Sequence, residues 1–164
     1  MISVASTVAA EAESLCAIQK AAFLPLYERY HDEGNPFLRG PEDILKRLGR
    51  EIFRYYTVRE DGEIVGGILY KCAGSTPFVD PLRPGDIYLG RVYITPERQG
   101  RKTAQTAIRM TMAEFPDARR FYVDFPADLE KNRRCYEACG FCDTGRRMDV
   151  ENGKLTLAML MCEI

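Results

Sequence analysis

The segment over residues 86–125 restricts the fold of this chain most. β-branched and aromatic residues dominate 86–95, helical spacing of apolar residues follows over 100–115, and strand-like alternation returns over 121–125. A strand–helix–strand unit joins two parallel strands through a right-handed crossover. The sequence therefore predicts a sheet that contains a parallel pair.

The other expected strands are joined as hairpins. Asp61-Gly62 and Asn152-Gly153 are the tight-turn dipeptides of two of them, and Gly90 is a candidate bulge. The expected strands cover 2–8, 53–59, 64–70, 86–95, 121–125, 142–149 and 155–162. The expected helices cover 9–30, a segment starting at Pro41, 100–115 and 128–139.

We expect Pro25 to kink or split the first helix, since proline cannot donate the helical hydrogen bond. Together the elements predict a mixed α/β (α+β) fold. Its mostly antiparallel central sheet would have about six or seven strands and be flanked by about four helices. The length of 164 residues favours one domain, 1–164, over two.

Charge and composition exclude several kinds of protein. The formal net charge of −1 argues against a nucleic-acid binder, and the chain lacks an apolar run long enough to span a membrane. His31 is the only histidine, which disfavours a metal centre, so we expect no metal ligand. Six cysteines without a secretory signal favour reduced thiols and a cytoplasmic location.

A turn that follows the strand over 86–95 is a candidate anion site. Pro96 ends the strand, and the helix expected from Gly100 presents backbone N–H groups that lack partners. Arg98, Arg101 and Lys102 add positive charge, and a pyrophosphate would fit there. A plain connection with a solvated basic turn explains the same residues.

A second candidate lies on the helix over 128–139. Asn132 and Tyr136 are spaced so that they share one helix face. A tyrosine hydroxyl can donate a proton, and an asparagine can hold a ligand amide. The alternative is that Tyr136 is a half-buried core aromatic and Asn132 a solvent residue.

Both segments together resemble the GNAT (Gcn5-related N-acetyltransferase) superfamily. The resemblance rests on Ile94-Thr95-Pro96, on the loop from Gln99 to Ala104, on Asn132 and Tyr136, and on Gly140-Phe141. One residue departs from the family pattern, because Lys102 stands where the family has its central loop glycine. We expect Lys102 to have helical dihedrals and to direct its ammonium at a phosphate.

The resemblance implies transfer of an acetyl group from acetyl-CoA to a primary amine by direct attack. Asn132 would contact the pantetheine arm, and Tyr136 would be the general acid that protonates the departing thiolate. The pantetheine arm would also contact Val92, Tyr93 and Ile94. The pyrophosphate would contact Gln99, Gly100, Arg101, Lys102, Thr103 and Ala104.

The resemblance leaves the general base and the acceptor open. Asp86 is our candidate for a catalytic base, with Tyr88 beside it and His31 as a weaker choice. Residues 24–39 and 73–85 would select a small-molecule or peptide amine. We expect no nucleic-acid or membrane partner, and a monomer or homodimer. The alternative function is a non-catalytic acyl-CoA-binding sensor or partner-binding module on the same fold.

Overall fold

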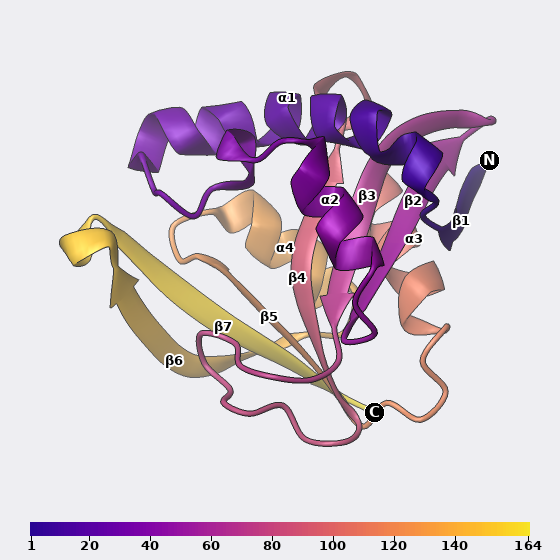
Figure 1. Cartoon of the computed structure of the whole chain (residues 1–164). Helices are drawn as coiled ribbons and strands as arrows, with labels where there is room; N and C mark the ends of the chain where they lie inside the picture. The colour runs from indigo at the N-terminus through magenta and orange to yellow at the C-terminus, as the bar shows by residue number, and fades with distance from the viewer.

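A single mixed sheet runs through the computed structural model, which describes residues 1–164 (Figure 1). Its strands are β1 (Ile2–Ser6), β2 (Phe53–Glu60), β3 (Glu63–Lys71), β4 (Asp86–Ile94), β5 (Arg120–Pro126), β6 (Cys142–Val150) and β7 (Leu155–Glu163). Their order is β1-β2-β3-β4-β5-β7-β6, and only β4 and β5 pair in parallel. The predicted fold class, with its single parallel pair, is confirmed.

The helices cover both faces of this sheet. They are α1 (Ala12–Tyr30), α2 (Pro41–Leu48), α3 (Thr103–Met112) and α4 (Glu130–Ala138), and the short 3-10 turns are η1 (Ala9–Glu11), η2 (Pro36–Leu38), η3 (Pro96–Arg98) and η4 (Glu151–Gly153). Helices α1 and α2 pack on one face, and α3 and α4 on the other (Figure 1). None of the helices is long and apolar enough to cross a membrane.

Two glycine positions behave as the sequence predicts. Asp61 and Gly62 have φ angles of 50° and 87°, which is the pair of positive values that a tight hairpin turn requires. Gly90 is the extra residue of a bulge, because Leu69 pairs with Arg91 while Tyr70 pairs with Leu89. The bulge lies in the middle of β4.

Helix boundaries differ from the prediction in two places. Pro25 does not split α1, which runs unbroken through it. Pro25 and Ala21 are both exposed, so the carbonyl that loses its helical partner can bond to water. Helix α3 begins at Thr103 rather than at Gly100, because the loop before it contains left-handed residues.

The core consists of two clusters separated by the sheet. The larger one joins alternate residues of β4, β5 and β7 to α3 and α4, and includes Leu89, Val123 and Tyr136. The smaller one packs α1 and α2 on β2, β3 and β4, and includes Leu15 and Tyr93. Neighbouring residues of β4 therefore point into different cores, as strand alternation requires.

A buried polar network fixes α1 and α2 to β4. Arg91 is only 8% exposed, and its guanidinium donates to Gln19 Oε1 at 2.9 Å and to Asp43 Oδ2 at 3.1 Å. Tyr55 and Tyr93 share a hydrogen bond of 2.7 Å beside it. Burial opposes ionisation of the Asp43 carboxyl, but Arg47 and Arg91 together hold its pKa below the usual range.

We predict that Arg91→Ala lowers the free energy of unfolding by about 3 kcal/mol, because it leaves Asp43 and Gln19 without their partner. Urea denaturation monitored by circular dichroism measures this loss. Arg54→Ala is the matched control, since Arg54 is exposed and forms no ion pair. Equal losses in both variants would contradict a structural role for the network.

Candidate active site

The parallel pair at the centre of the sheet separates after a short stretch. Strands β4 and β5 pair from Asp86 with Arg120 to Leu89 with Val123, and no further. Beyond Leu89, β4 continues to Ile94 against β3 alone, while β5 continues against β7 alone. One edge of the second half of β4 therefore has no strand partner, and its backbone can pair with an extended ligand.

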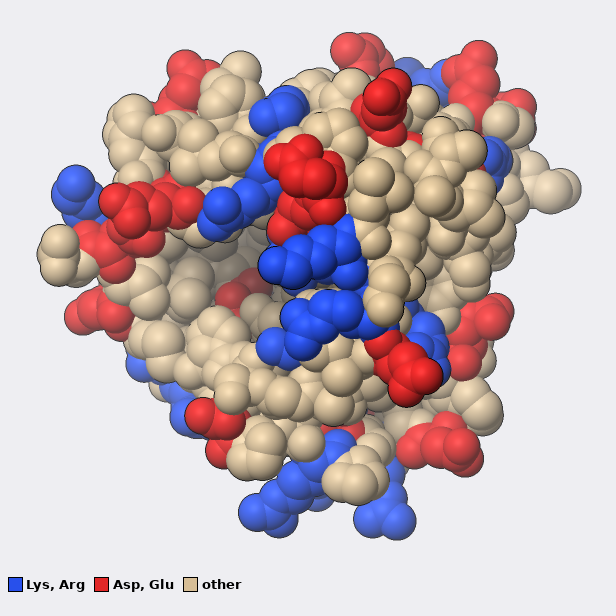
Figure 2. Space-filling model, in the orientation of Figure 1, with Lys and Arg blue, Asp and Glu red and all other residues tan.

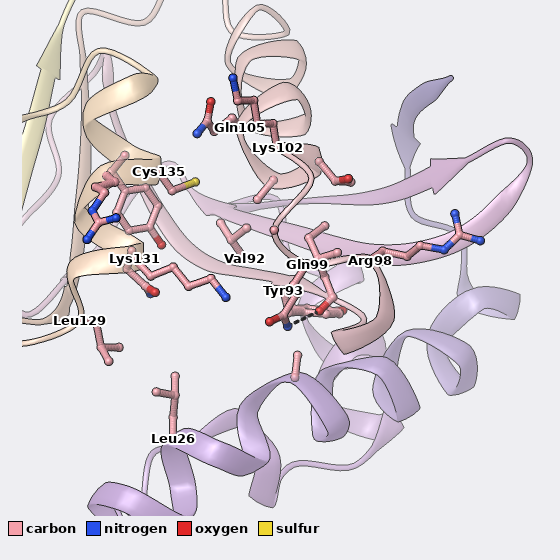
Figure 3. Close-up of a pocket in the computed structure, with 18 of the residues that line it drawn as sticks. Leu26, Val92, Tyr93, Arg98, Gln99, Lys102, Gln105, Leu129, Lys131 and Cys135 are labelled. Carbon is pink, nitrogen blue, oxygen red and sulfur yellow. Dashed lines mark hydrogen bonds between the residues drawn. The ribbon is translucent and has the colours of Figure 1, made fainter.

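A pocket of about 500 Å³ lies beside this free edge. Its walls are the end of β4, the start of α3, one face of α4 and the middle of α1 (Figure 3). It gathers ten residues that the sequence singled out: Val92, Tyr93, Ile94, Gln99, Gly100, Lys102, Thr103, Ala104, Asn132 and Tyr136. The structure therefore brings the two predicted segments together in one cavity.

The loop at the mouth of the pocket corrects our expectation for Lys102. Its φ and ψ are 64° and 13°, so it is left-handed rather than helical. Lys102 precedes the first residue of α3, and Gly100 is also left-handed, with φ 78°. Since this region is the one that glycine enters most easily, Lys102 adopts a backbone conformation typical of the residue it replaces.

This loop leaves a row of backbone donors free. Thr106 is the first residue of α3 whose N–H bonds backwards, to Lys102 O at 3.0 Å. The N–H groups from Gly100 to Gln105 therefore have no partner in the protein. The amide of Gln99 donates to Ile94 O at 2.8 Å and closes the turn. Such donors at a helix N-terminus suit an anion such as a phosphate.

Of the three positive charges that the sequence suggested around the loop, only Lys102 lines the pocket without an ion-pair partner. Arg98 pairs with Glu60 and with Glu63, the latter at 3.2 Å, and points away from the pocket (Figure 3). Arg101 is exposed and does not line the pocket. Lys131 and Arg134 of α4 do line it, without ion-pair partners, and were missed because helix α4 meets the loop only in the fold.

Tyr136 presents a hydroxyl to the pocket from a buried ring. The ring packs against Phe125 and Phe141, with centroids 5.4 and 6.0 Å away. The hydroxyl forms no hydrogen bond within the protein. Every fully buried side-chain oxygen in the structure has a hydrogen-bond partner, so this hydroxyl is not fully buried. It therefore opens onto the pocket that Tyr136 lines. Burial raises the pKa of Tyr136 above its usual value, so the hydroxyl keeps its proton at neutral pH.

Asp86 does not lie with these residues. It is the first residue of β4, at the end opposite Ile94, and it is absent from the lining of the pocket. Its carboxylate accepts the N–H of Arg83 at 3.1 Å and lies 3.9 Å from Arg120. The structure therefore gives Asp86 no place in this pocket, and its role as a catalytic base stays a prediction.

Tyr88 has a partner that the sequence analysis missed. Its hydroxyl donates to Asp124 Oδ2 on β5 at 2.6 Å. Asp124 lies between Val123 and Phe125, which are buried in the larger core, so its side chain points to the opposite face of the sheet. The signal in the sequence was an aspartate inside a predicted central strand. Its hydrogen bond with Tyr88 of β4 can be seen only in the folded structure.

The aromatic residues at the end of α1 stabilise the helix end. Tyr27 stacks on Phe37 with centroids 5.3 Å apart, and its edge meets His31 at 5.4 Å. The hydroxyl of Tyr30 donates to Asp128 at 2.5 Å, which ties α1 to the segment before α4. Burial and this carboxylate raise the pKa of Tyr30 to about 12.

Fold and pocket together define an α/β protein whose pocket, between a separated strand pair and a helix N-terminus, has the shape and donors for an extended anionic ligand. The model of the acetyltransferase (GNAT) family matches residues 15–141, and the chain belongs to this family. The resemblance noted in the sequence is thereby confirmed. No curated protein sequence matches the chain.

Solved structures of acetyltransferases share the fold. An acetyltransferase from Thermus thermophilus is 19% identical, with a TM-score of 0.73 and coverage of 100% of this chain and 97% of that one. The ribosomal-protein-S18-alanine N-acetyltransferase from Escherichia coli is 12% identical, with a TM-score of 0.73 and coverage of 100% and 94%. Spermidine N-acetyltransferase from Vibrio cholerae, in complex with CoA and spermine, is 13% identical, with a TM-score of 0.75 and coverage of 99% and 95%.

We predict that Lys102→Gly is more stable than Lys102→Ala by about 1 kcal/mol, because alanine keeps the strain of the left-handed backbone and glycine removes it. Both variants remove the same charge, so their comparison isolates the backbone. Thermal or urea unfolding of the pair measures the difference. Equal stability would show that position 102 is not left-handed in solution.

Proposed function

We propose that this protein transfers the acetyl group of acetyl-CoA to a primary amine by direct attack, with Tyr136 as the general acid. The observation that carries the proposal is one pocket that combines free loop N–H groups with the protonated Tyr136 hydroxyl. Family membership supports acetyl transfer. The family also includes structures that contain CoA, such as the spermidine enzyme described above.

The pocket suggests how acetyl-CoA binds. The pyrophosphate lies against the N–H groups that follow Gln99, where Lys102 and Lys131 add positive charge. The pantetheine arm extends along the free edge of β4, past Val92 and Ile94, and its amides pair with the strand backbone. The Asn132 side chain faces the same pocket without a hydrogen-bond partner in the protein and is available to the arm.

This placement brings the thioester to the gap between β4 and β5. A backbone N–H of the free β4 edge polarises the thioester carbonyl as negative charge develops on its oxygen. The amine attacks that carbon, and the tetrahedral intermediate expels the CoA thiolate. Tyr136 donates its proton to this sulfur, which its high pKa and open hydroxyl make possible.

An acceptor screen tests the proposal. The panel contains spermidine, phosphinothricin and a peptide with an N-terminal alanine, each with acetyl-CoA, and thiol release is followed together with mass spectrometry of the product. Acetylation of any amine in the panel supports the proposed acetyltransferase activity. Tight CoA binding without turnover on any amine would instead favour the non-catalytic acyl-CoA-binding sensor or partner module.

The cytoplasmic location and the monomeric or dimeric state stay predictions.

We predict that Tyr136→Phe lowers kcat by about 100-fold, since general-acid catalysis contributes at least that much in comparable reactions. The dissociation constant for CoA should change less than about threefold, because phenylalanine keeps the buried ring. Steady-state kinetics and calorimetry measure the two quantities. Tyr56→Phe is the matched control, a buried tyrosine outside the pocket. A wild-type kcat in Tyr136→Phe would rule out the general acid.

We also predict that Lys131→Glu weakens CoA binding by about tenfold at low salt, and less at about 0.5 M salt, where charges are screened. Arg101→Glu should have a smaller effect, because Arg101 lies outside the pocket lining. Calorimetric titration with CoA gives each dissociation constant. Arg54→Glu is the control with the same change in net charge, and an equal loss there would contradict a local anion site.

A further inference from the structure

Asp124 is a carboxylate for which the proposed reaction has so far no role. It is half-buried on β5, and no Arg, Lys or His forms an ion pair with it. Its side chain accepts one hydrogen bond, from the Tyr88 hydroxyl at 2.6 Å. A buried carboxylate with a single neutral donor is poorly compensated, so a cation would bind favourably beside it.

The position of Asp124 is next to the proposed reaction centre. Val123 is the last residue of β5 that pairs with β4. Asp124 is therefore the first residue of β5 beyond the point where the two strands separate. Tyr136 reaches the same gap from the face covered by α3 and α4, whereas Asp124 points to the face covered by α1. The two groups interact electrostatically across the gap.

A separate pocket opens on the Asp124 face. Asp124 pairs with Met159 of β7, and Tyr122 pairs with Met161, so all of them project from one side of the sheet. Tyr122, Met159 and Met161 line a pocket of about 440 Å³ beneath the loop between β3 and β4, and its charged lining residues are Asp80, Arg83 and Arg146. Asp124 is not part of this lining but pairs with Met159, which is. Figure 2 views this face and shows a hollow below α1 with acidic atoms at its floor.

The charge state of Asp124 suits a proton acceptor. Burial raises the pKa of its carboxyl to about 6, and the Tyr88 hydroxyl opposes this rise. The titratable group that contacts it is Tyr88 from β4, while β7 contributes the uncharged Met159. Tyr136 from α4 acts on it electrostatically from the other face of the sheet. At neutral pH the carboxylate is therefore ionised, and it still binds a proton more tightly than an ordinary aspartate does.

We propose that Asp124, positioned by Tyr88, binds the ammonium group of the acceptor and takes its proton before the amine attacks the thioester. This inference rests on the proposed function and adds the amine site to it. The acceptor enters from the side of the pocket lined by Tyr122 and Met161, and acetyl-CoA occupies the pocket between α1, α3 and α4.

The proposed step conserves protons and electrons. One N–H bond of the ammonium breaks, and the proton joins the Asp124 carboxylate, which later releases it to water. The nitrogen lone pair forms the C–N bond, and the electrons of the C–S bond leave with the sulfur. Tyr136 protonates that sulfur and regains a proton that the nitrogen loses on becoming an amide. The net change is ammonium plus acetyl-CoA to amide, CoA thiol and one proton.

The first experiment measures kcat/KM against pH for Asp124→Asn and Tyr88→Phe, with the panel amine that the wild type acetylates. In the wild type, kcat/KM should fall on the acid side with an apparent pKa of about 6. Asp124→Asn should lose about 100-fold in kcat/KM with unchanged CoA affinity. Tyr88→Phe should move the acid limb to higher pH, because it removes the hydrogen bond that lowers the pKa of Asp124.

Stability provides a check on folding. Because burial disfavours the ionised Asp124, Asp124→Asn should unfold at the same temperature as the wild type or higher at about pH 8. Asp149→Asn is the matched control, an exposed strand aspartate that should leave the kinetics unchanged. Wild-type kcat/KM and an unmoved acid limb in Asp124→Asn and Tyr88→Phe would overturn the inference while leaving acetyl transfer intact.

A second measurement does not depend on turnover. Carbon-13 NMR of labelled aspartate, assigned with Asp124→Asn, follows the Asp124 carboxyl during titration with spermidine. Binding of the ammonium should lower the pKa of Asp124, and the variant should bind spermidine at least about tenfold more weakly. An Asp124 carboxyl signal that does not change when any panel amine is added overturns the amine site. A signal that changes in a protein without turnover supports the amine site and contradicts the proposed acetyltransferase activity.

Discussion

The early end of pairing between β4 and β5 is the constraint on which the rest of the site depends. A parallel pair inside a sheet normally satisfies its backbone groups along the whole length of both strands. Here the ladder stops at Leu89 and Val123, and each strand continues with its outer neighbour only. The gap gives an extended ligand a strand edge to pair with. It also lets groups from both faces of the sheet approach one point.

The gap stays open because each half of the sheet has its own support. On one side, Arg91 and its partners fix the second half of β4 to α1 and α2. On the other side, Phe125 of β5 packs against Tyr136 of α4, and the strand pairs with β7 to its end. The hydrogen bond from Tyr30 to Asp128 joins the two halves across the opening. Two separately packed cores can hold such an opening without closing it.

Local patterns predicted the elements well, and contacts distant in sequence were beyond their reach. Periodicity found the strands, and Pro96 with Gly100 located the loop before α3, because these signals act over a few residues. The prediction of helical dihedrals for Lys102 is wrong because it places Lys102 in the first turn of the helix, whereas α3 begins only at Thr103. The partners of Arg98 and Tyr88 lie on other strands, so spacing along the chain could not reveal them.

The proposed acid and base keep different protonation states although burial acts on both in the same direction. Burial raises the pKa of both Tyr136 and Asp124, but the ordinary pKa values of a tyrosine and an aspartate are about 6 units apart. At neutral pH the tyrosine therefore stays protonated while the aspartate stays ionised, even though both border one gap. Two groups with separated pKa values on opposite faces can act on different substrates without exchanging their proton. The sheet thus assigns proton donation to the thioester side and proton acceptance to the amine side.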